Sequence, residues 1–124
     1  MKLNEISNVR LISQQIAGTK LRSPKEIVGW MGAIQAQDFN MAKWAIGIRQ
    51  NKAIEENIDA AINSGEIIRT HVLRPTWHFV SADDIYWMLE LTAPRIKSFM
   101  KSSNKLLELT EKILTKSNMI IEKA

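Results

Sequence analysis

The hydrophobic residues of this chain change their spacing at Gly65, and that change limits the fold more than any other feature. Up to Gly65 they recur every three or four positions, as in amphipathic helices. Beyond it, the runs 68–73 and 77–80 alternate apolar and polar residues on either side of Arg74-Pro75-Thr76, which predicts a β-hairpin. The pattern therefore predicts a mainly α protein with one β-hairpin (α+β).

Four helices are expected before the hairpin. The spacing predicts them at about 5–17, 23–35, 41–48 and 53–64. Ser23 is suited to cap the second helix, Pro24 to open it and Glu26 to close a capping box. The first half of the chain is therefore expected to be helical almost throughout.

Three more helices are expected after the hairpin: one capped by Ser81, a short one restarted by Pro94, and a long one over 105–122. Helices followed by a hairpin are typical of a winged helix-turn-helix, in which one helix enters the DNA major groove and the hairpin, or wing, lies against the backbone. We expect a winged-helix domain over 1–92 with its wing at about 67–80. Residues 93–124 are expected to form a helical extension, the truncated start of a second winged-helix unit.

Length and composition narrow the class of protein. A chain of 124 residues is enough for one domain, and 45% hydrophobic with 24% charged residues is typical of a soluble globular protein. The chain has no cysteine for a disulfide or thiolate site, and two histidines are too few for a histidine metal site. No apolar run approaches the roughly 18 residues of a membrane span. We expect a cytoplasmic protein without a membrane, metal or cofactor.

The positive charge is concentrated in the first half of the chain. Residues 1–50 hold seven Lys and Arg against three acids, which accounts for the whole net charge of +4. A basic half suits double-stranded DNA, because each phosphate contact releases counterions. Five residues of the third helix and the hairpin are expected to contact the DNA backbone: Lys43, Arg49, Arg69, Arg74 and His78.

Other polar and aromatic groups have structural explanations. Two pairs of carboxylates fall in first turns of predicted helices, where acids stabilise the helix dipole: Asp83 with Asp84, and Glu55 with Glu56. His71 and His78 lie on opposite arms of the hairpin and lack a third metal ligand nearby. The four tryptophans sit on apolar stripes and are expected to lie mostly in the core: Trp30, Trp44, Trp77 and Trp87.

Gln35, Gln37 and Asp38 are the most informative polar group. They follow an apolar helix, and a buried amide without a partner costs about 1–3 kcal/mol. Residues two apart point about 200° from each other in a helix, so the two amides share a target only where the helix unwinds into an extended turn. The glutamines either cap neighbouring backbone or act together on a ligand.

Three segments resemble the winged-helix DNA glycosylases of the AlkZ and YcaQ type. They are Trp30 to Asp38 (WMGAIQAQD), Trp44 to Arg49 (WAIGIR) and Arg69 to Asp84 (RTHVLRPTWHFVSADD), in the family's order and at plausible spacing. The family removes alkylated purines, including crosslinked bases, by hydrolysing the N-glycosidic bond. The resemblance implies a Gln-x-Gln catalytic motif at Gln35 and Gln37 that holds the attacking water, with Asp38 as a candidate for electrostatic stabilisation.

Two alternatives stay open at this point. The chain could be a non-catalytic winged-helix DNA-binding module or transcription regulator that shares the fold. It could also be an interaction domain that self-associates through apolar surface left by truncation, because members of the family are much longer and contain several winged-helix units. An open cleft at the glutamines favours catalysis, whereas glutamines packed under Trp30 and Trp44 favour the binding module.

Overall fold

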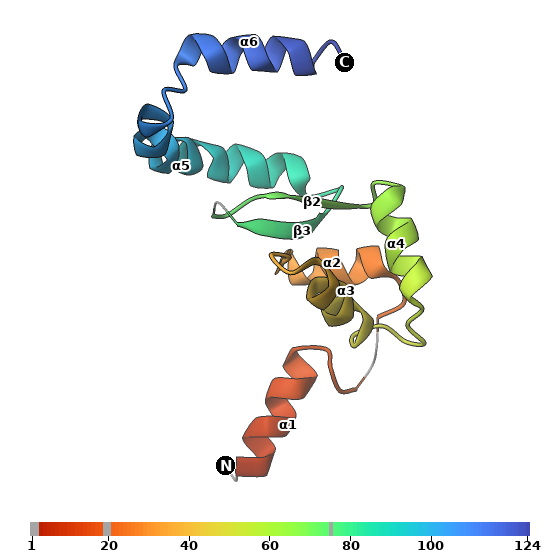
Figure 1. Ribbon diagram of the computed structural model, residues 1–124. Helices are drawn as coiled ribbons and strands as arrows, with labels where there is room; N and C mark the ends of the chain where they lie inside the picture. The colour runs from red at the N-terminus through yellow and green to blue at the C-terminus, as the bar shows by residue number, and fades with distance from the viewer. Residues whose placement is uncertain (1–2, 19–20, 75) are drawn as a thin grey trace.

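The computed structural model describes residues 3–18, 21–74 and 76–124, which form six helices and a three-stranded antiparallel sheet (Figure 1). The helices are α1 (Leu3–Ser13), α2 (Pro24–Met31), α3 (Phe39–Gly47), α4 (Glu55–Asn63), α5 (Ile85–Leu106) and α6 (Glu111–Ile121). The strands are β1 (Ala33–Gln35), β2 (Ile67–His71) and β3 (Trp77–Ser81). The predicted mainly helical α+β fold is confirmed.

Strand β3 is the centre of the sheet and pairs with β1 on one side and β2 on the other. The β2–β3 pair is the predicted hairpin, whereas β1 is a strand that the sequence did not reveal. Facing residues of antiparallel neighbours lie on the same face of a sheet. The register therefore places two rows on opposite faces: Ile34, Phe79 and Arg69 on one, and Gln35, His78 and Thr70 on the other.

Different helices cover the two faces of the sheet (Figure 1). The face that carries Phe79 packs against α2, α3 and α4, in a core whose fully buried side chains include Ile27, Ile46 and Phe79. The other face packs through Val80 against the first turn of α5. Both sides of the hairpin are thus anchored, because burial of each large apolar side chain contributes about 1.5–3 kcal/mol.

The second predicted helix ends four residues early. Its start is as expected, since the Ser23 hydroxyl accepts the Glu26 N–H at 3.1 Å, although the Glu26 carboxylate accepts the Arg22 N–H instead of completing a box with Ser23. The helix stops at Met31, where Gly32 takes a φ of 74° that suits glycine. Residues 33–35 then leave the helix because β3 offers their backbone groups hydrogen-bond partners.

The helices after the hairpin also differ from the prediction. Ser81 ends β3 instead of capping a helix, and α5 continues through Pro94, which removes one helix hydrogen bond without ending the helix. The prediction of one helix over 105–122 is wrong. Helix α5 ends at Leu106, residues 107–110 are not helical, and Thr110 caps the new helix α6. Helix α5 runs unbroken through residues 92 and 93, and the division into two units there stays a prediction.

Much apolar surface of the described residues is exposed. Helices α1 and α6 lie at opposite ends of the molecule (Figure 1), and no described residue of α6 is buried. The expectation that the tryptophans are mostly core is wrong: the exposed fractions are 48% for Trp30, 60% for Trp44, 36% for Trp77 and 50% for Trp87. Self-association through this surface stays a prediction. Among the described residues, no helix combines the length and apolarity that crossing a membrane requires.

Candidate active site

The glutamine segment, residues 35–37, lies along the edge of the sheet. Gln35 ends β1 opposite His78, and the Ala36 N–H donates to the Trp77 carbonyl at 2.8 Å, which continues the pairing one residue further. Ala36 is buried, whereas Gln35 and Gln37 are exposed. This alternation is that of an extended segment, in which side chains two apart point to the same side. The unwinding that the two amides need in order to converge is therefore present.

Gln35 and Gln37 line one open hollow of about 310 Å³, together with Asp38 and the first turns of α3. The hollow has room for ordered water, since one water molecule occupies about 30 Å³ in the liquid. Neither Gln35 nor Gln37 is sealed in the core or packed under Trp30 and Trp44. The hollow is therefore open to solvent, while the bond of Gln37 to the Trp77 backbone is the capping use that the sequence also allowed. The catalytic role of the two amides stays a prediction.

The hairpin fixes the orientation of the Gln37 side chain. Its Oε1 atom accepts the Trp77 backbone N–H at 3.1 Å. Because a backbone N–H can only donate, the amide oxygen must face Trp77 and the amide NH₂ must point elsewhere. Gln37 therefore presents donors, and one remaining oxygen lone pair, in a defined direction.

Arg69 ties β2 to the glutamine segment. Its Nε and Nη2 atoms both donate to the Ala36 carbonyl, at 3.1 and 2.9 Å. The guanidinium also lies 4.7 Å from the Trp77 ring centroid and 5.6 Å from that of Phe39. The charge of Arg69 is thus used to hold the backbone between the two glutamines, and its contact with DNA stays a prediction.

Asp38 begins α3. Its Oδ1 atom accepts the Met41 N–H at 3.0 Å, which makes it the N-cap of that helix. The carboxylate lies at the positive end of the helix dipole, where negative charge is favoured. It borders the same hollow as the glutamines, and its part in catalysis stays a prediction.

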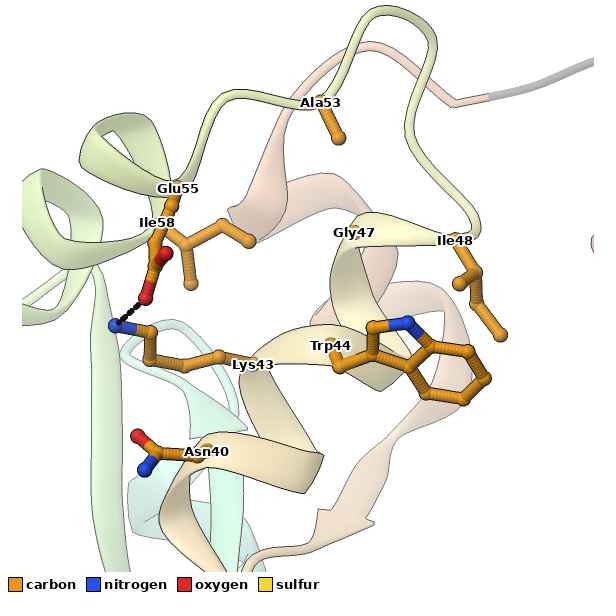
Figure 2. Close-up of a pocket in the computed structure, with 8 residues that line it drawn as sticks. All are labelled: Asn40, Lys43, Trp44, Gly47, Ile48, Ala53, Glu55 and Ile58. Carbon is orange, nitrogen blue, oxygen red and sulfur yellow. Dashed lines mark ion pairs between the residues drawn. The ribbon is translucent and has the colours of Figure 1, made fainter.

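Lys43 and Arg49, on the third predicted helix, are engaged within the protein. Lys43 is buried, and its Nζ atom lies 2.7 Å from carboxylate oxygens of both Glu55 and Asp59. It borders a hollow of about 320 Å³ between α3 and α4, where Figure 2 shows its ion pair with Glu55. The hydrogen bonds that Lys43 donates to Asp59 and Glu55 raise its pKa. Arg49 is also buried, donates to the Gln14 and Ala45 carbonyls, and has its pKa lowered by burial. Their expected contacts with DNA gain no support from these positions.

The hairpin residues are placed differently from one another. His78 is buried, and its Nδ1 atom lies 2.8 Å from the Thr76 carbonyl oxygen, to which it must donate. His71 does not face His78 but stacks on the Trp77 ring at 4.0 Å. Arg74 is exposed in the loop between the strands. In the part of the chain that the structure describes, no three His, Asp or Glu side chains gather in a way that could hold a metal ion.

A comparison with known families identifies the chain. The family model described as DNA glycosylase AlkZ-like matches residues 28–113, a span that includes the glutamine segment, the hairpin and all of α5. No curated protein and no solved structure gives a significant match. The chain belongs to the AlkZ-like DNA glycosylase family. A DNA glycosylase-type function in DNA repair, with DNA as the partner, follows from that membership.

Two residues have positions in this site that the sequence did not indicate. Trp77 was expected as a core aromatic, yet its backbone N–H holds Gln37 and its ring covers Arg69. Arg69 was expected to bind phosphate, yet it binds Ala36. The alternating pattern 68–80 predicts the strands that carry both residues. It contains no signal for the partner on β1, because pairing register between distant segments is not a local property.

Proposed function

We propose that this chain is a DNA glycosylase domain that hydrolyses the N-glycosidic bond of alkylated bases, of the N7-substituted guanine type and including crosslinked ones. A water molecule positioned by Gln35 and Gln37 is the nucleophile. The observation that carries the proposal is that both amides border one open hollow, within the segment that the family model matches.

Glutamine has no usable pKa and cannot remove a proton as a carboxylate would. Its carbonyl can accept a hydrogen bond from water, and its NH₂ group can donate one. In this proposal the free Gln35 carbonyl holds the water, while the NH₂ group of Gln37, whose oxygen is bound to Trp77, keeps Gln35 in register. Positioning of this kind lowers a barrier by orientation rather than by proton transfer.

An N7-alkylated guanine makes such positioning sufficient. The base carries a positive charge, so the electron pair of the breaking bond between C1′ and N9 neutralises it and the base leaves without a general acid. The water oxygen forms the new bond to C1′, and its proton is lost to solvent. The sugar passes through an oxocarbenium-like state, which the Asp38 carboxylate and fixed dipoles are suited to stabilise.

Release of N7-methylguanine from a methylated duplex tests this proposal. We expect Gln37→Ala to lower single-turnover release by at least about 100-fold, the lower range for a positioned catalytic group. Asn63→Ala, which removes an exposed amide on α4, is the matched control and should leave release unchanged. Binding of the unmodified duplex should persist in both variants. Undiminished release by Gln37→Ala would remove the catalytic assignment, and duplex binding without any release by the unchanged chain would favour a non-catalytic binding module.

A further inference from the structure

A further cleft, distinct from the two hollows described above, lies between the hairpin loop and α5. It measures about 220 Å³ and is lined by Leu73, Arg74, Arg95, Ile96 and Phe99. Both arginines are exposed, and among the described residues neither guanidinium takes part in a hydrogen bond or ion pair. This distinguishes them from Lys43, Arg49 and Arg69, whose charges are engaged within the protein.

The two stretches of chain that form this cleft, 67–82 and 91–107, contain no Asp or Glu. The hairpin has none between Glu66 and Asp83, and α5 has none between Glu90 and Glu108. Over the latter stretch the chain carries four bases: Arg95, Lys97, Lys101 and Lys105. The tertiary structure therefore places two unneutralised arginines at this cleft, outside the first 50 residues in which the excess of positive charge is found by counting.

The backbone of the hairpin loop holds Arg74 in a defined place. Leu73 has a φ of 64°, and the Arg74 N–H donates to the Val72 carbonyl at 2.6 Å, which is a γ-turn of the rarer, strained kind. Val72 just before it is fully buried in the cluster with Ile85 and Met88 of α5. The two walls of the cleft are thus joined through a packed core, which keeps the arginines on facing elements.

The chemistry of the cleft fits a phosphodiester. Guanidinium groups bind phosphate oxygens through paired N–H donors, and they do so more strongly where water is partly excluded. Three apolar side chains, those of Leu73, Ile96 and Phe99, line the cleft beside the arginines, although Leu73 and Phe99 are themselves exposed. The cleft holds one phosphate only. Lys97 lies two residues from Arg95 and points about 200° away from it, and Lys101 and Lys105 line a separate hollow with Glu108 and Glu111.

We propose that Arg74 and Arg95 together hold one backbone phosphate of duplex DNA in this cleft. The proposal rests on the proposed function only in taking duplex DNA as the ligand. Arg95 is thereby assigned to the DNA interface, together with Arg74, on the side of the sheet that packs against α5.

Fluorescence anisotropy of an unmodified duplex over a range of salt concentrations tests the assignment. Each phosphate contact contributes about one unit to the slope of log affinity against log salt. We expect Arg74→Ala and Arg95→Ala each to weaken binding regardless of DNA sequence. The double variant should lower the slope by about 1, because the two guanidinium groups share one phosphate. Arg10→Ala, an exposed arginine of α1 outside the cleft, is the matched control and should leave the slope unchanged.

A second comparison separates DNA from a small phosphate ligand. Inorganic phosphate should displace the duplex no better than chloride at the same ionic strength, because most of the duplex affinity comes from its other phosphates. An unchanged slope in the double arginine variant would overturn the proposal, as would displacement of the duplex by inorganic phosphate at concentrations where chloride has no effect. Base release is measured separately. Its absence together with altered slopes contradicts the proposed function alone, whereas normal slopes with Gln37-dependent release contradict this proposal alone.

Discussion

Replacing Arg69 by alanine tests whether this residue positions the glutamine segment or binds DNA. The substitution removes two hydrogen bonds to the Ala36 carbonyl and the contact of the guanidinium with the Trp77 ring. A hydrogen bond from a charged group is worth about 1.5–3 kcal/mol net. The ring contact adds about 0.5–1 kcal/mol. We therefore expect a loss of about 2–4 kcal/mol in the free energy of unfolding, and a Tm lower by roughly 10 °C for a domain of this size.

The same substitution should lower base release roughly 10- to 100-fold, because a displacement of about 1 Å in a positioned group costs up to about 100-fold. Duplex affinity and its salt slope should stay unchanged. Thermal melts, single-turnover release and salt-dependent anisotropy measure the three quantities. Arg69→Lys keeps the charge but loses the paired donors, so it should lose stability as well. A slope lowered by about 1 in Arg69→Ala, together with an unchanged Tm, would refute the reasoning and make Arg69 a phosphate contact.

Two further predictions concern charged residues around α3. Asp38→Asn should keep the cap of α3 and thus the Tm, yet lower base release, whereas Asp38→Ala should in addition cost about 1 kcal/mol of stability; equal release by Asp38→Asn and the unchanged chain would leave Asp38 a cap only. Lys43 has its pKa raised above 10.5 by Asp59 and Glu55, so its stabilising contribution is complete below pH 10.5 and is lost as the pH rises through the higher folded-state value. Asp59→Asn should therefore flatten the fall of Tm above pH 10.5, and parallel Tm curves for the two proteins would contradict this assignment.

Local sequence was sufficient for the elements whose causes are local. Ser23 and Pro24 start α2 because a hydroxyl and a proline suit the first turn of any helix. The alternation over 68–80 gives the hairpin because side chains on a strand alternate between faces. The spacing of Gln35 and Gln37, two residues apart, is likewise visible in the sequence. So is the need for the helix to unwind there before both amides can face one target.

Contacts between distant segments decided the rest. From the sequence alone, the charge of Lys43 was expected to be free to contact DNA, but α4 brings Glu55 and Asp59 against it. The pattern around Gly32 reads as helix, but β3 supplies hydrogen-bond partners that turn residues 33–35 into a strand. Composition and spacing along the chain thus determined the kinds of element, and the resemblance of three segments to a known family supplied the catalytic candidates. Only the tertiary structure decided which charges remain free and what holds the glutamines, because ion pairs and strand register join residues that the sequence separates.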